Sequence, residues 1–136
     1  MVVALRPAQT FGGIDNRSVL YPTGCRVFNK GANPVVLNLV QDATITGGAW
    51  TANGGESVAE TNAGGTASGG AIVNSYFIKG GECKDIELHS FEKNRRGIRR
   101  KSIVTGYQNQ SLQVLTMEAA QSADVRASLN WDEVRA

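Results

Sequence analysis

The sequence predicts an all-β protein, a single β-sandwich or barrel of about seven to nine short, mostly antiparallel strands. Three observations predict this class. Runs of β-branched and aromatic residues recur along the chain. Clusters of Gly, Asn, Asp and Pro separate these runs about every 8–12 residues. Glycine accounts for 16 of 136 residues, well above the usual share of about 7%. The length is that of one domain.

The strand-like segments follow one another between residue 19 and the C-terminal region. The predicted strands cover residues 19–21, 25–29, 35–40, 56–60, 72–78, 82–92, 103–107 and 112–117. Segments 25–29 and 35–40 are joined by the five-residue turn sequence KGANP. A link of this length is typical of a β-hairpin, so we expect these two strands to pair.

Three segments depart from this pattern. Residues 1–24 are rich in turn residues, and we expect an N-terminal arm, frayed or lying on a neighbour, before a β-sandwich domain of residues 25–136. Residues 61–71 (TNAGGTASGGA) are nearly all small, which predicts a flexible Gly-rich loop. Residues 117–124 contain good helix formers, but the alternation of apolar and polar residues over 125–131 favours a strand.

The charge is unevenly distributed. Six of the 14 basic residues fall in residues 93–101, which contain no acid, so the remaining chain has eight basic and 12 acidic residues. We predict a partner-binding basic loop there, formed by Lys93, Arg95, Arg96, Arg99, Arg100 and Lys101. Acidic residues precede it at Glu82, Asp85, Glu87 and Glu92. The run can be a solvated loop, dock on an acidic protein surface such as a neighbouring copy, or contact nucleic acid. Segregated charge favours contact between identical subunits.

Catalytic and cofactor motifs are missing from the sequence. The single histidine, His89, has no neighbouring nucleophile motif. The glycine-rich segment lacks the Lys-Ser/Thr ending of a P-loop. Cys25 and Cys83 are too far apart in sequence for a zinc motif. We therefore expect no enzymatic activity, cofactor or metal, although a calcium site on the Asn/Asp loops stays open. The two cysteines form one disulfide or remain free, and we expect free thiols.

One stretch supports a family resemblance. In residues 26–58 (RVFNKGANPVVLNLVQDATITGGAWTANGGESV), a strand ending in Asn-x-Gly-Ala precedes an apolar strand, and an Asn-Gly-Gly-Glu turn introduces the next. This pattern resembles small virion structural proteins of tailed bacteriophages, of the head-decoration and spike-base type. It covers about a quarter of the chain and carries over no functional residue beyond the turn glycines. The resemblance implies a structural role in a particle, with subunits joined around a symmetry axis.

We therefore predict a structural protein of a phage or virus particle, first of all a capsid decoration (cement) protein that stabilises the shell through inter-subunit contacts. The expected partners are identical subunits, as a homo-oligomer such as a trimer, and the major capsid protein or another virion protein. The expected location is the virion, after assembly in the host cytoplasm, with no membrane association. The alternatives are a neck or tail component, a carbohydrate-binding β module using Trp50 and Trp131, and a nucleic-acid-binding domain using the basic run.

Overall fold

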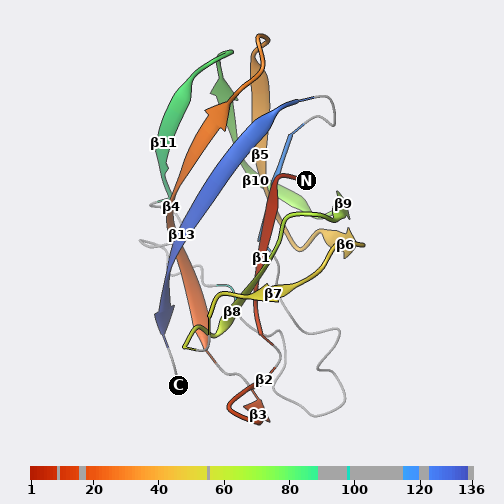
Figure 1. Ribbon diagram of the computed structural model, residues 1–136, viewed down its shortest axis with the longest axis vertical. Helices are drawn as coiled ribbons and strands as arrows, with labels where there is room; N and C mark the ends of the chain where they lie inside the picture. Colours follow the sequence, from red (N-terminus) through yellow and green to blue (C-terminus); the bar gives the residue numbers. More distant parts are fainter. Residues whose placement is uncertain are drawn as a thin grey trace.

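The computed structural model describes residues 1–8, 10–15, 18–54, 56–88, 98, 115–119 and 123–134. Within these residues every regular element is a β-strand (Figure 1). The strands of these described residues form open sheets and no closed barrel, so the predicted all-β class is confirmed, in its sandwich-like form. Eight of the described strands have four residues or more.

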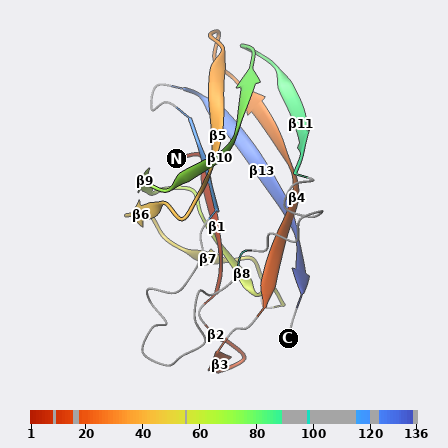
Figure 2. The ribbon, with the colours of Figure 1, turned by 180° about the vertical axis from the view of Figure 1, so that it is seen from behind.

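Two sheets build the body of the molecule, and all their pairings are antiparallel. The six-stranded sheet has the order β10-β5-β12-β1-β8-β7. Its strands are β1 (Val3–Pro7), β5 (Val35–Gln41), β7 (Thr51–Ala52), β8 (Ala59–Asn62), β10 (Ala71–Ile78) and β12 (Leu115–Glu118). The three-stranded sheet has the order β11-β4-β13, with β11 (Cys83–Glu87), β4 (Val19–Asn29) and β13 (Val125–Val134). Figure 2 shows the same arrangement from behind.

Two small two-stranded sheets complete the described fold. The first pairs β2 (Thr10–Phe11) with β3 (Ile14–Asp15), at the lower end of the view in Figure 1. The second pairs β6 (Thr44–Thr46) with β9 (Thr66–Ser68), which project to one side of the six-stranded sheet.

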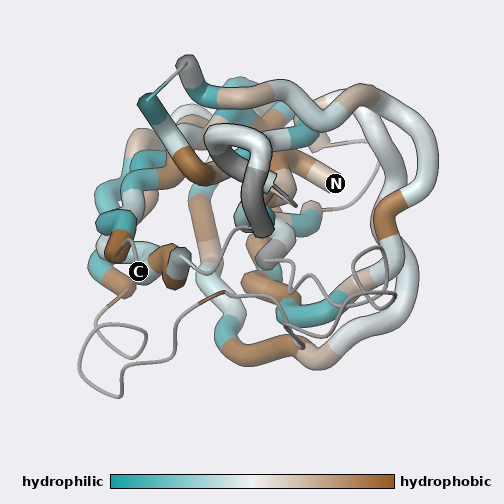
Figure 3. The backbone as a smooth tube through the Cα atoms, turned by 90° about the horizontal axis from the view of Figure 1, so that it is seen from below, coloured by the Kyte–Doolittle hydropathy of each residue, from teal (hydrophilic) through white to brown (hydrophobic). Residues whose placement is uncertain are grey.

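The hydrophobic core lies between the inner faces of the two large sheets. Along β4, buried and exposed residues alternate from Cys25 to Asn29, as expected for a strand with one face on a core. Hydrophobic positions accordingly alternate with paler and hydrophilic ones along parts of the backbone in Figure 3. The six-stranded sheet contributes Leu5, Leu37, Leu39, Ile78 and Met117, and the three-stranded sheet contributes Leu20, Cys25, Val27, Ile86 and Leu129.

The predicted hairpin between residues 25–29 and 35–40 is wrong. β4 pairs with β11 and β13, whereas β5 pairs with β10 and β12. The linking residues 30–34 therefore carry the chain from one sheet to the other. Both strands bury one face, with Val27 on β4 and Leu37 on β5, and these faces meet across the core. The same turn residues occur in a hairpin within one sheet and in an arch that crosses from one sheet to the other. The local sequence therefore could not distinguish these two connections.

The N-terminal segment lies inside the fold, which corrects the expectation of an arm over residues 1–24. β1 is inserted between β12 and β8, and its residues Ala4 and Leu5 are fully buried. The strand expected at residues 19–21 is continuous with the one at 25–29, and together they form β4. Burial of this kind stabilises the domain itself, so residues 3–7 and 19–24 are not available to reach a neighbour.

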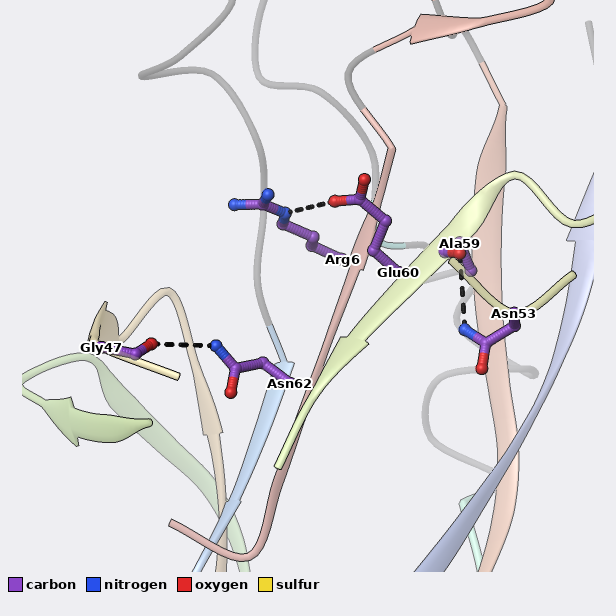
Figure 4. Close-up of polar contacts among 6 residues, drawn as sticks. All are labelled: Arg6, Gly47, Asn53, Ala59, Glu60 and Asn62. Atoms are coloured by element: carbon purple, nitrogen blue, oxygen red, sulfur yellow. Dashed lines mark hydrogen bonds and ion pairs between the residues drawn. The ribbon is translucent and has the colours of Figure 1, made fainter. Parts of the chain in front are cut away.

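The Gly-rich stretch 61–71 also contains regular structure where a loop was expected. It includes the end of β8, all of β9 and the start of β10. Asn62 is buried, and its Oδ1 accepts hydrogen bonds from the backbone N–H groups of Gly64 and Gly65 at 3.0 and 3.1 Å. Its Nδ2 donates to the carbonyl of Gly47 at 3.2 Å (Figure 4). Gly48 has a φ of 66°, and a Cβ there would clash with the Asn62 side chain, so the close approach requires glycine.

Candidate assembly surface

The basic run predicted as a partner-binding site lies outside the described residues, apart from its central isoleucine. Ile98 is fully buried, and its backbone N–H and C=O both hydrogen-bond to Leu20, at 2.7 and 2.9 Å. The centre of the run is therefore anchored on β4. The role of Lys93, Arg95, Arg96, Arg99, Arg100 and Lys101 stays a prediction from the sequence. Sequence reasoning missed the anchor, although an isolated isoleucine among basic residues was the signal for it.

The acidic block, one candidate partner for such a run in a neighbouring copy, is partly neutralised within its own chain. Asp85 on β11 pairs with Arg26 on β4, with 2.7 Å between Oδ1 and Nε. The hydrogen bond from Arg26, and then its charge, lower the pKa of Asp85. Both side chains remain largely exposed, so the pair contributes little to stability. Glu82 accepts a long hydrogen bond from the backbone of Lys79. Glu92 lies outside the described residues.

A shallow polar pocket of about 430 Å³ is lined by residues of β4, β11 and β13. Its lining residues are Gly24, Cys25, Arg26, Asp85, Ile86, Ser128 and Asn130. Burial, and then the nearby Asp85 charge, raise the pKa of Cys25 to about 11. The thiol is therefore protonated at neutral pH and is a poor nucleophile.

The two tryptophans considered for carbohydrate binding do not share a surface. The guanidinium of Arg6 lies 4.0 Å from the ring centroid of Trp50, and Arg6 also pairs with Glu60 at 2.9 Å (Figure 4). Trp131, on β13, packs against the core, and its indole N–H donates to Glu133. The contacts of Trp50 are thus with residues of the six-stranded sheet, whereas Trp131 belongs to the three-stranded sheet. The two rings do not form a joint stacking platform.

The cysteines are free, which settles the question that the sequence left open. Cys25 is buried opposite Ile86, whereas Cys83 is exposed opposite Phe28. The two thiols lie on opposite faces of the same sheet and cannot form a disulfide.

In the part of the chain that the structure describes, no three His, Cys, Asp or Glu side chains come together as a possible metal site.

Of the five large hydrophobic side chains that are exposed among the described residues, three lie at one edge of the six-stranded sheet. β10 is the terminal strand of that sheet, and no described strand pairs with its other side. It contains no charged residue, and Ile72 and Phe77 are 62% and 59% exposed. Phe77 lies directly opposite Val36 of β5, which is 49% exposed. We call residues 71–78 the β10 edge.

Backbone groups of the β10 edge point away from β5. The carbonyl of Phe77 accepts a hydrogen bond from Nζ of Lys84 at 3.2 Å, and the N–H of Ser75 donates to Oδ1 of Asn74 at 2.9 Å. In an antiparallel ladder, alternate residues direct both backbone groups to the same side. The backbone N–H and C=O groups of Ser75 and Phe77 therefore point to the open side of β10. There, the hydrogen bonds that these groups make are to side chains of the same chain. A long, neutral edge strand of this kind is a template for pairing with another chain.

No family model, curated protein or solved structure matches this chain. The described residues include no helix long and apolar enough to cross a membrane. A function must therefore be inferred from the surfaces themselves.

Proposed function

We propose that this chain is a non-enzymatic structural protein of a virus particle, specifically a capsid decoration (cement) protein that binds copies of itself and a neighbouring shell protein. The β10 edge is the observation that carries this proposal. The resemblance of residues 26–58 to small virion proteins of tailed bacteriophages gives the kind of particle.

Proteins that act as monomers normally protect a free sheet edge with charges, proline, bulges or a covering segment. The β10 edge is eight residues long and has no charge or proline. It carries a bulge between Ile72 and Asn74, and it leaves two large apolar side chains more than half exposed. Retaining such an edge is costly for a solitary protein, because the edge promotes association. An assembling protein uses the same feature as a contact.

The basic run supplies a second contact in this proposal. Its six cationic residues flank Ile98 in the sequence, and Ile98 is anchored in the core. Charge-matched surfaces steer association and fix orientation more than they add affinity. The run would accordingly orient the protein on an acidic shell surface, while apolar contacts elsewhere hold it there.

The proposal is tested by locating the chain in particles. An antibody against the purified protein is applied to density-gradient-banded particles from its source, in blots and in immunogold micrographs. We expect the chain to band with the particles and the gold to cover the heads. Gold confined to the neck or tail would contradict the proposed decoration role and would favour the alternative of a neck or tail component. A chain that is found only in the free protein fraction would contradict a virion role altogether.

A further inference from the structure

We infer that two copies of this chain pair through their β10 strands, antiparallel about a two-fold axis beside Ser75. The inference rests on the proposed self-assembly function and specifies its partner and its register. Three features of the β10 edge lead to it: the bulge in the strand, the direction of its backbone groups and the distribution of charge around it.

The bulge places the two exposed apolar residues on the same face. Ile72 and Phe77 are five residues apart, so a regular strand would direct them to opposite faces. The bulge between Ile72 and Asn74 changes this, because Ile72 pairs with Val40 and Phe77 pairs with Val36. The two residues therefore occupy one face, and Ser75, opposite Asn38, lies midway between them.

This arrangement is self-complementary. An antiparallel second copy centred on Ser75 brings Ile72 of each chain against Phe77 of the other. The two-fold axis therefore creates this contact twice, and the exposed Ile72 and Phe77 side chains of both copies are covered. On the opposite face, Asn74 meets Tyr76 of the second copy. Within one chain these two residues already share a hydrogen bond of 2.9 Å, so polar groups meet polar groups. Ser75 faces its own copy on the axis.

The backbone directions are compatible with this register and exclude a shift by one residue. Ser75 and Phe77 turn their N–H and C=O groups outward, so Ser75 can exchange hydrogen bonds with its own copy across the axis. A register shifted by one residue would set these outward groups opposite backbone groups of the second copy that are directed toward β5, and the hydrogen bonds would be lost. A shift by two residues would keep the hydrogen bonds but separate Ile72 from Phe77 of the second copy.

Charge also favours a second copy as the occupant. The strand itself is neutral. Lys79 follows its C-terminal end, Lys84 reaches that end through the Phe77 carbonyl, and Glu82 binds the Lys79 N–H there, so this end has one net positive charge. Asp42 directly follows β5 beside the N-terminal end. Antiparallel pairing brings the lysine end of each copy next to the Asp42 end of the other, so this pairing brings opposite charges together.

The contact is small for a protein interface. A stable interface usually buries more than about 1,000 Å² in total. A single strand edge with two aliphatic or aromatic side chains per copy falls short of this, since an aromatic side chain buries only about 150–250 Å². The Lys84 and Asn74 side chains must also release the backbone groups that they bind. We therefore expect a weak, reversible dimer that is populated at high local concentration, as on a particle surface.

Single-cysteine cross-linking tests the register. In a Cys83→Ser background, Ser75→Cys places two thiols across the axis. Opposed residues of a hydrogen-bonded pair have Cα atoms about 5.5 Å apart, within the range that a disulfide spans. Ile72→Cys is the matched control, because it is on the same face but about 14 Å from its own copy, four strand positions away. The background variant alone controls for Cys25.

On mild oxidation we expect Ser75→Cys to give covalent dimer at least about tenfold above Ile72→Cys, because disulfide formation requires close Cα atoms. Ile72→Cys and Phe77→Cys should cross-link in an equimolar mixture and much less when oxidised separately. Circular dichroism confirms that each variant folds.

The outcomes separate the two proposals. If the wild-type chain self-associates in sedimentation velocity while Ser75→Cys stays monomeric after oxidation, the register is wrong and the proposed assembly function still stands. If Ser75→Cys cross-links but the chain is absent from particles, the dimer is real and the virion function is wrong. Cross-linking of Ile72→Cys alone, in preference to the mixture, would also overturn the two-fold pairing at Ser75.

Discussion

Replacing Asn29 with alanine should destabilise the point where the chain crosses between the two sheets. Asn29 ends β4, and its side chain is fully buried. Its Nδ2 donates to the carbonyls of Asn33 and Lys79 at 2.8 and 3.2 Å, and more weakly to Ile78 at 3.4 Å. Its Oδ1 accepts from the N–H of Gly31 at 3.0 Å. One side chain thus ties together β4, the arch of residues 30–34 and the end of β10.

The magnitude follows from the groups left without a partner. Asn29→Ala removes two good hydrogen bonds to carbonyls and one from an N–H, and a buried polar group without a partner costs about 1–3 kcal/mol. Water reaches the partly exposed arch and compensates in part, so we expect a loss of about 2–4 kcal/mol in the free energy of unfolding. This is a large share of the roughly 5–15 kcal/mol of a typical domain.

Urea unfolding followed by tryptophan fluorescence measures this loss. Asn38→Ala is the matched control, because Asn38 is only partly buried and its side chain accepts one hydrogen bond, from Ser75 at the sheet edge. Surface changes of this kind usually stay within about 0.5 kcal/mol. The midpoint should shift for Asn29→Ala with an unchanged slope. An Asn29→Ala protein as stable as the Asn38→Ala protein would refute the idea that this side chain holds the arch.

Three further predictions concern the core, the anchor and the edge. Folding raises the pKa of Cys25 from 9.0 to about 11, so the unfolded chain loses its proton first. Stability from this group is then complete below pH 9 and falls toward pH 11, by at most about 3 kcal/mol because solvent screens part of the shift, and Cys25→Ala should flatten that part of the unfolding curve against pH. Ile98→Ala should lower stability by about 2–5 kcal/mol in urea unfolding, whereas an unchanged midpoint would mean that Ile98 does not anchor the basic run. Phe77→Lys puts a charge on the otherwise neutral β10 edge and should abolish self-association in sedimentation equilibrium, and unchanged association would contradict the role of the β10 edge.

The sequence predicted individual strands well because their signals are local. Residues 72–78 were predicted as a strand and form β10, and the alternation over 125–131 correctly favoured the strand found as β13. Pairing is different, because it joins distant segments. Val3 on β1 lies opposite Met117 on β12, and the local sequence of neither segment indicates that the other is its pairing partner. The arm and hairpin expectations failed for this reason.

The candidate site shows the same limit. Clustered arginines and lysines are visible in a sequence, so the basic run could be singled out. The β10 edge could not, because being at an edge is a property of the strand order. A period of two assigns Ile72 and Phe77 to opposite faces, and only the bulge in the register with β5 brings them together.

The inferred pairing constrains how the protein assembles. A two-fold contact uses the same strand on both chains and closes after one copy is added, so it cannot extend into a lattice. The trimer expected from the sequence would need a heterologous contact elsewhere, such as the basic run against an acidic surface. The β10 edge belongs to the six-stranded sheet, whereas Ile98 bridges to β4 of the three-stranded sheet. If the basic run binds a shell as we propose, the chain would pair with a copy through one sheet and reach the shell from the segment anchored on the other, as a protein that clamps adjacent shell subunits requires.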